Sequence, residues 1–297
     1  MRILHLTDTH LFADPAARHY DRIATAEALR AVLERLSGLR GVDLVVHSGD
    51  ASEDGSVASY RLLHEMLDPF AARLGAKLVV AMGNHDVPAA YAQVAGPGDH
   101  AAPYQDRVVT TGDGARAVVL DTSVPGAGYG HLDTVQLDWL RRILAVPARR
   151  GTVLVLHHPP LEAATPLLRA LDLDGLDELS AAIEGSDVRV ILSGHYHHAL
   201  DGRLGAVPVH VAPGVTNVVD PLGADQHERA VALSGASLVE IDGRSAQSAP
   251  RITTSVWPNA GDLPADGGPG GHRLRPVYDF DEEAVRGIVE AAGRRHV

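Results

Sequence analysis

The first half of the chain alternates short apolar runs with longer helical patterns, and this alternation restricts the fold more than any other feature. Apolar runs over 2–6, 42–47 and 77–82 are separated by stretches over 21–36 and 56–73, whose apolar residues recur at helical spacing. Strands joined by helices of this length form β-α-β units with a parallel sheet. Because the runs are almost continuously apolar, we expect a sheet that is covered on both faces.

The second half of the chain predicts more strands and a different connectivity. We expect strands near 105–110, 116–121, 152–157, 188–193, 207–212, 236–241 and 251–256, and helices over 133–145 and 176–184. The short connections in the last third favour antiparallel pairing, because parallel strands need long crossovers. The second half is therefore expected to add a second sheet.

The C-terminal stretch differs from the rest in composition. Residues 258–276 are rich in Gly and Pro, which predicts a loop or linker. A short amphipathic helix is expected over about 280–293. We therefore expect one main domain over 1–257, followed by a linker and helix over 258–297. The helix is expected to dock on its own domain or on a second copy of the chain, which allows a homodimer.

Composition excludes several classes of protein. The chain has no cysteine, so disulfide frameworks, thiolate zinc sites and cysteine nucleophiles are excluded. Its 26 basic and 38 acidic residues give a net charge of −12, which argues against a nucleic acid polymer as partner. No apolar run approaches the roughly 20 residues that span a bilayer, and the N-terminus reads as a strand rather than a signal peptide. We expect a soluble cytoplasmic protein with no membrane partner.

Polar clusters that contain metal-binding residue types follow five of the apolar runs. They are Asp8-Thr9-His10, Gly49-Asp50, Gly83-Asn84-His85-Asp86, His157-His158 and Gly194-His195-Tyr196-His197. In open α/β sheets, ligands bind at the carboxyl ends of the strands. Oxygen and imidazole donors without sulfur suit divalent ions such as Mn²⁺, Fe²⁺, Co²⁺ or Zn²⁺. The sequence therefore predicts a metal site where these five loops converge.

Spacing within the clusters indicates which side chains meet. In an extended segment, residues two apart point the same way, so Asp8 with His10, and His195 with His197, can each meet one ion. The two oxygens of Asp50 can bridge two ions, which lie about 3.5–4 Å apart in two-metal hydrolases.

Glycines precede two of these residues directly. Gly49 and Gly83 are expected to let the backbone turn sharply before Asp50 and Asn84.

The ordered set of clusters resembles the calcineurin-like metallophosphoesterase family. The family motifs D-x-H, G-D, G-N-H-D/E, a single H and G-H-x-H all occur between residue 1 and about 220. The resemblance implies an α/β fold, a four-layer α/β/β/α sandwich of two mixed sheets flanked by helices. It also implies two divalent metal ions per chain, with Mn²⁺, Fe²⁺/Fe³⁺, Zn²⁺ or Co²⁺ as the candidates.

The resemblance also implies a role for each matching residue. One ion would be held by Asp8, His10, Asp50 and His197, and the other by Asp50, Asn84, His157 and His195. His85 would be a catalytic histidine beside the substrate phosphate rather than a ligand.

Longer sequence segments indicate which branch of the family the chain resembles. The segments LHLTDTHLF (4–12), MGNHD (82–86), VLDTSVPG (119–126), LHHPP (156–160) and SGHYHH (193–198) resemble bacterial class III cyclic-nucleotide phosphodiesterases and glycerophosphodiesterases. This resemblance implies hydrolysis of a small phosphodiester, most of all a 3′,5′-cyclic nucleotide such as cAMP, by a hydroxide held between the metals.

Two other activities and one non-enzymatic function are the alternatives to this prediction. A glycerophosphodiesterase or a phosphomonoesterase of the same family would share every ligand. A non-enzymatic scaffold is disfavoured, because no ligand position is lost.

Other polar residues have simpler interpretations. His5 and His47 lie inside strands and are expected to be structural. We expect His158 to hydrogen-bond beside the metals without binding them, and Asp86 to orient its turn. The loop over 126–131 is a further place where side chains could touch the substrate.

Overall fold

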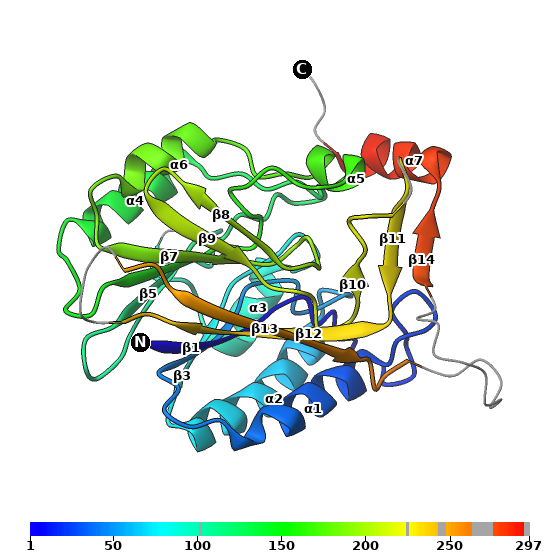
Figure 1. The fold of residues 1–297 in the computed structure, drawn as a ribbon, viewed down its shortest axis with the longest axis horizontal. Coiled ribbons are helices and arrows are strands. Elements are labelled where there is room, and N and C mark those ends of the chain that lie inside the picture. Colours follow the sequence, from blue (N-terminus) through cyan, green and yellow to red (C-terminus); the bar gives the residue numbers. More distant parts are fainter. Residues whose placement is uncertain (101–102, 224–225, 243–247, 263–275, 294–297) are drawn as a thin grey trace.

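The computed structural model describes residues 1–100, 103–223, 226–242, 248–262 and 276–293 (Figure 1). Its strands are β1 Arg2–Leu6, β2 Leu44–His47, β3 Lys77–Val80, β4 Arg107–Thr110, β5 Arg116–Val119, β6 Thr152–Val155, β7 Val188–Ser193, β8 Leu200–Leu204, β9 Val207–Val211, β10 Val218–Val219, β11 Glu228–Val231, β12 Leu233–Glu240, β13 Arg251–Pro258 and β14 Pro276–Phe280. Its helices are α1 Thr25–Arg35, α2 Val57–Leu74, α3 Pro88–Ala95, α4 Thr134–Leu144, α5 Pro166–Ala170, α6 Leu176–Ile183 and α7 Glu282–Ala292, with a 3₁₀ turn at Leu36–Gly38.

Two large mixed sheets form the body of the molecule. The first has the order β13-β12-β1-β2-β3, with β1, β2 and β3 parallel and β12 and β13 antiparallel. The second has the order β4-β5-β6-β7-β9-β8, with a parallel centre and antiparallel edge strands β4 and β8. The predicted parallel strands of the first half and the predicted second sheet are confirmed, but the antiparallel strands β12 and β13 of the last third extend the first sheet.

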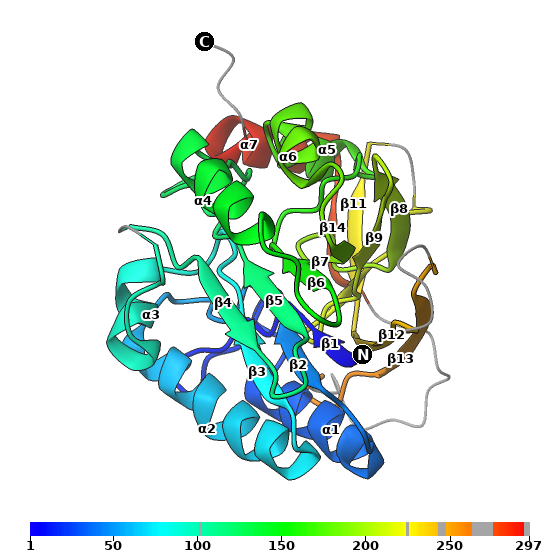
Figure 2. The same cartoon turned by 90° about the vertical axis from the view of Figure 1, so that its left-hand side faces the viewer.

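The two sheets pack face to face through buried aliphatic side chains. Ile3 and Val46 come from the first sheet, and Val119, Val155 and Leu192 come from the second. Helices α1 and α2 cover the outer face of the first sheet, and α4 and α6 cover the outer face of the second (Figures 1 and 2). The four-layer α/β/β/α sandwich is therefore confirmed.

Helix ends follow the capping chemistry of the sequence. Helix α2 begins after Ser56, whose side chain accepts a hydrogen bond from the Ser59 N–H, and ends at Gly75 in the left-handed conformation. Helix α4 begins with a capping box between Asp133 and Gln136. These capping residues fix the positions at which the loops before α2 and α4 end.

A small third sheet was not anticipated from the sequence. Strands β10, β11 and β14 form it, so the chain after residue 257 contributes a strand as well as a helix. Helix α7 packs on α5 through Val285, Leu167 and Leu171, and the Gly128 N–H donates to the carbonyl of Ala292 at 2.8 Å. The helix thus docks on its own chain. Most of the predicted linker, over 263–275, lies outside the described residues.

Within the part of the chain that the structure describes, no helix combines the length and the apolar character needed to cross a bilayer.

Candidate metal centre

The seven predicted ligands lie in loops at the carboxyl ends of five parallel strands. The loop after β1 carries Asp8 and His10, the loops after β2 and β3 carry Asp50 and Asn84, and the loops after β6 and β7 carry His157, His195 and His197. Donor atoms of Asp8, His10, Asp50 and His197 all lie within 4.8 Å of one another. This is the grouping that the family resemblance implied for one ion.

Five of these residues adopt a left-handed backbone conformation. Asp8, His10, Asp50, His195 and His197 have φ angles of 54°, 43°, 50°, 68° and 53°. Such angles are uncommon outside glycine, cost about 1–3 kcal/mol each and cluster at functional sites. The prediction that extended segments direct Asp8 with His10, and His195 with His197, toward one ion was therefore wrong. Tight left-handed turns after the strands aim them.

His10 and His197 face each other across this group, with their Nε2 atoms 3.2 Å apart. The other ring nitrogen, Nδ1, donates to the Glu53 carboxylate at 2.6 Å in His10 and to the Asn217 carbonyl at 3.2 Å in His197. Because these oxygens only accept, each neutral ring presents a lone pair at its facing Nε2, and two such lone pairs repel unless a cation lies between them. Ligands about 2.0–2.2 Å from a common ion lie roughly 3 Å apart. The pair therefore fits a metal.

His157 and His195 are oriented in the same way. Nδ1 of His157 donates to the Ser48 carbonyl at 2.9 Å, and Nε2 of His195 donates to the Leu171 carbonyl at 3.0 Å. Each ring therefore keeps one nitrogen as a lone-pair donor for a metal. Hydrogen bonds of this kind fix the tautomer of metal-binding histidines.

Asp50 lies between the two groups of donors. Its Oδ2 is 3.3 Å from Nε2 of His157 and 3.7 Å from Nε2 of His10. Its Oδ1 accepts the backbone N–H of His85 at 3.0 Å. One carboxylate therefore contacts donors on both sides, which is the position that a bridging ligand requires.

Buried polar atoms without a hydrogen-bond partner occur at several places among the described residues, and three of them are Oδ2 of Asp8, Oδ1 of Asn84 and Nε2 of His157. Leaving a buried polar atom unpaired costs about 1–3 kcal/mol. All three belong to predicted ligands, and a divalent ion satisfies oxygen and imidazole donors of this type. The residues present therefore fit a dinuclear centre.

His158 has a supporting role although it lies close to His157 and His195. Its Nδ1 bonds the Thr122 hydroxyl at 2.7 Å, and its Nε2 donates to the Gly128 carbonyl at 3.2 Å. With both ring nitrogens engaged, it has no donor left for a metal. The prediction that His158 hydrogen-bonds beside the site is confirmed.

The Asp86 carboxylate connects the two loops that carry Asp50 and Asn84. Its carboxylate accepts the N–H groups of Ala51 at 3.1 Å, Ser52 at 3.0 Å and Gly83 at 2.9 Å. The loops after β2 and β3 are thereby joined, and the prediction that Asp86 orients its turn is confirmed.

The two glycines before ligands have different physical roles. Gly49 has a φ of 107°, so the predicted sharp turn is present. Gly83 has no positive φ, so the predicted sharp turn does not explain why a glycine stands at this position. A Cβ at position 83 would overlap the carboxylate and the backbone nitrogen of Asp50, so glycine is required there by close approach.

Glu53, which was not predicted from the sequence, contacts three histidines. Its Oε2 lies 2.6 Å from Nδ1 of His10, 3.4 Å from Nδ1 of His19 and 3.3 Å from Nδ1 of His85. An acid three residues after Asp50 in the same loop was the available signal. His19 was missed because it lies in a loop with no apolar pattern around it.

Charges in the site perturb its titrations. Loss of hydration disfavours the charged His85 ring, but the carboxylates of Asp50 and Glu53 outweigh it and raise its pKa to about 10. Burial and the neighbouring His157 lower the pKa of His195 to about 3, so that its ring is a neutral donor at pH 7. Burial opposes ionisation of Asp50, yet the histidines around it hold the pKa of this carboxyl well below its ordinary value.

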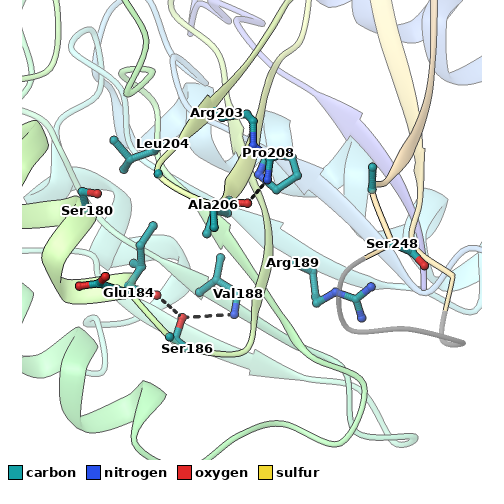
Figure 3. Close-up of a pocket in the computed structure, with 15 residues that line it drawn as sticks. Ser180, Glu184, Ser186, Val188, Arg189, Arg203, Leu204, Ala206, Pro208 and Ser248 are labelled. Carbon is teal, nitrogen blue, oxygen red and sulfur yellow. Dashed lines mark hydrogen bonds between the residues drawn. The ribbon is translucent and has the colours of Figure 1, made fainter.

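A pocket of about 400 Å³ lies elsewhere, where β7 and β9 begin (Figure 3). Glu184 and Ser186 line it just after α6, Arg189 lines it from β7, and Arg203 lines it from the β8–β9 hairpin. Ligands of α/β sheets bind at the carboxyl ends of strands, and this pocket is at the amino ends. Its lining residues hold none of the metal-binding groups found among the described residues.

Comparison with known proteins identifies the family of this chain. The profile of the family described as calcineurin-like phosphoesterase matches residues 1–199. The chain is 41% identical over 213 residues to a cAMP/cGMP dual specificity phosphodiesterase of Mycobacterium tuberculosis, covering 71% of this chain and 66% of that protein. It is 36% identical over 206 residues to the 3′,5′-cyclic adenosine monophosphate phosphodiesterase CpdA of Escherichia coli, covering 68% of this chain and 71% of that protein.

Solved structures share the fold at low sequence identity. A dimetal phosphatase from Danio rerio aligns with a TM-score of 0.57 at 13% identity, covering 84% of this chain and 98% of that one.

Proposed function

The chain belongs to the calcineurin-like phosphoesterase family, and from this premise we propose that it hydrolyses 3′,5′-cyclic nucleotides with two divalent metal ions. The position of Asp50 carries the proposal, because one carboxylate contacts His10 on one side and His157 on the other. The relatives named as cyclic-nucleotide phosphodiesterases support the substrate class.

Each ion has four proposed protein ligands. One set is Asp8, His10, Asp50 and His197, and the other is Asp50, Asn84, His157 and His195. The unpaired buried atoms of Asp8, Asn84 and His157 support this assignment. Mn²⁺, Fe²⁺/Fe³⁺, Zn²⁺ and Co²⁺ all suit such donors.

When bound, two such ions neutralise phosphate charge and lower the pKa of a water molecule, so that it can attack phosphorus near neutral pH. The chain itself supplies orientation and a proton. The Glu53 carboxylate holds Nδ1 of His85, which leaves Nε2 as the ring nitrogen that meets the substrate. The carboxylates of Asp50 and Glu53 favour the charged ring, so His85 carries a proton to give. We assign His85 as the acid that protonates the departing ribose oxygen.

The test is a substrate panel on the Mn²⁺-loaded protein. We expect cAMP and cGMP to be hydrolysed with a higher kcat/KM than 2′,3′-cyclic nucleotides, glycerophosphodiesters or phosphomonoesters. A tenfold preference for a glycerophosphodiester or for a monoester would overturn the proposed substrate class.

The metal assignment is tested separately by elemental analysis. Asp50→Asn keeps the shape of the side chain but removes the charge between the two ions, so both ions and the activity should be lost. Asn84→Ala should mainly empty one site. Two tightly bound ions and normal turnover in Asp50→Asn would contradict the bridging role.

A further inference from the structure

A cavity of about 540 Å³ opens directly beside the proposed metal centre. Asn84 and His85 form its inner end, and it continues along the start of α3, where Val87 and Ala89 line it. The loop that joins β5 to α4 and the segment before β4, which carries Tyr104, form its other walls. A substrate whose phosphate lies at the metals therefore has its leaving group beside this cavity.

The walls of the cavity are mostly apolar. Val87, Pro88, Val124 and Pro125 line it, together with the ring of Tyr104. Small-ligand sites of about 300–1,000 Å³ have such apolar walls and a few placed polar groups. The size and lining therefore match a small organic group rather than an ion.

The polar side chains that line the cavity include the carboxylates of Asp86, Asp121 and Asp133, and the charged donor is His85 at the inner end. Tyr104 donates its hydroxyl hydrogen to Asp133, which fixes the plane of the ring. Asp133 is about half exposed at 49%, and His131 lies 3.6 Å from it. None of the residues lining this cavity is Lys or Arg. A second anionic group is therefore disfavoured, and a neutral group with N–H donors is favoured.

We propose that this cavity binds the nucleoside of the substrate, with a purine base stacked on Tyr104. The inference rests on the proposed function for the substrate class. Bases stack on aromatic rings whatever their identity. Asp133 accepts a hydrogen bond from an N–H group of the base, and the apolar residues at the start of α3 contact the ribose. Apart from Asn84 and His85 at its inner end, the residues of the cavity thus set substrate preference without entering the chemical step.

The test fills the cavity without touching the metal centre. Ala89 is an exposed residue of α3 that lines the cavity, and Ala89→Trp places an indole in it. Gln93→Trp is the matched control, since Gln93 is exposed one turn further along the same helix and lies outside the cavity. Tyr104→Leu removes the proposed stacking ring without adding bulk. All variants are studied as Mn²⁺-loaded proteins.

The first measurement is calorimetric binding of adenosine, which has the nucleoside but no phosphate. We expect saturable binding to the wild type and to Gln93→Trp, and at least tenfold weaker binding to Ala89→Trp and Tyr104→Leu. Equal binding to all four proteins, or no saturable binding to the wild type, would overturn the inference.

The second measurement compares kcat/KM for cAMP with that for methyl 4-nitrophenyl phosphate, a small diester with no nucleoside. Ala89→Trp should lower kcat/KM for cAMP at least tenfold more than kcat/KM for the small diester, mainly by raising KM.

The outcomes separate the cavity assignment from the proposed function. If the wild type hydrolyses cAMP and Ala89→Trp loses no more kcat/KM for cAMP than Gln93→Trp does, the cavity assignment fails and the proposed function stands. If adenosine binds as expected but no cyclic nucleotide is hydrolysed, the proposed function fails and the cavity assignment stands. Preferential turnover of glycerophosphocholine that Ala89→Trp abolishes would assign the cavity to a cationic headgroup instead.

Discussion

His85 is the residue at which two chemical roles can be separated by experiment. As a general acid it matters most for a basic leaving group, such as the ribose oxygen of cAMP, and little for 4-nitrophenolate. General acid catalysis contributes about 10²–10⁴-fold. We expect His85→Ala to slow cAMP hydrolysis at least tenfold more than that of bis(4-nitrophenyl) phosphate, a difference of about 1.4 kcal/mol in barrier. Both metals should stay bound.

Two results would contradict this role of His85. Equal losses on the two substrates would favour stabilisation of the phosphoryl oxygens, and loss of metal would indicate a structural role.

Glu53 is expected to act through the histidines that it holds. It accepts from Nδ1 of His10 at 2.6 Å, and partners of this kind typically change metal affinity about 10–100-fold when removed. Glu53→Ala should weaken Mn²⁺ binding by that factor, measured by competition with a chromophoric chelator. Glu53→Gln should recover most of the affinity, because its amide oxygen still accepts a hydrogen bond. Glu65→Gln, at an exposed position on α2, is the control. If Glu53→Ala binds Mn²⁺ like the control, Glu53 does not position His10.

Gly83 tests the close packing around the bridging carboxylate. A methyl group there overlaps Asp50, so Gly83→Ala should displace this carboxylate and lower the affinity for both ions at least tenfold. Gly38→Ala is the matched control, because a Cβ at that position meets no atom within 4 Å. If Gly83→Ala binds two ions with wild-type affinity, the added methyl group does not displace the Asp50 carboxylate enough to affect metal binding.

The order of motifs predicted the residue types of the site but not its geometry. Asp8, Asp50 and the histidines were identified because metal-binding residues followed successive strands. The left-handed turns could not be predicted, because they are imposed by partners far away in the chain. Asp8, for example, has a left-handed backbone and donates its N–H to the carbonyl of Gly49, which lies in the loop after another strand. Glu53 was missed for the same reason, since its contacts depend on how loops from different strands meet.

At the scale of elements, α7 is held by few contacts. Val285 is its one buried side chain among the described residues. It packs on Leu167 of α5 and on Leu171, the residue that follows α5. Val285→Ala should lower the free energy of unfolding by about 1–2 kcal/mol, measured by urea denaturation. Val135→Ala is the control, because Val135 is 51% exposed on α4. Metal content should not change. A loss no larger than that of Val135→Ala would show that α7 contributes little to the fold.

Prediction of elements succeeded where burial leaves a strong pattern. The central strands β1, β2, β6 and β7 are buried almost throughout, and their apolar runs marked them clearly. Edge strand β8, with sequence LDGRL, has no fully buried residue and was missed. Strand β14 was missed because its partner β11 lies far away in sequence and its own pattern adjoins a Gly- and Pro-rich stretch. Elements that rely on tertiary partners leave weak local signals.

At the scale of the whole molecule, the proposed ligands come from both large sheets. Asp8, Asp50 and Asn84 follow strands of the first sheet, and His157 and His197 follow strands of the second. Each proposed ion takes ligands from both sheets, so metal binding joins their carboxyl edges. Apart from this centre, buried aliphatic side chains hold the two sheets together.

Metal loading is therefore expected to stabilise the two sheets together. A ligand at 100 times its Kd stabilises the fold by about 2.7 kcal/mol per site, and each kcal/mol raises Tm by roughly 2–4 °C in a protein of a few hundred residues. Mn²⁺ should then raise Tm by at least about 5 °C over chelator-treated protein. Asp50→Asn should lose most of this shift, because the bridging charge is gone. Hydrogen exchange gives the sharper measurement: protection should increase in β2 of the first sheet and in β6 of the second at the same Mn²⁺ concentration. Protection that increased in only one sheet would mean that the ions do not connect them.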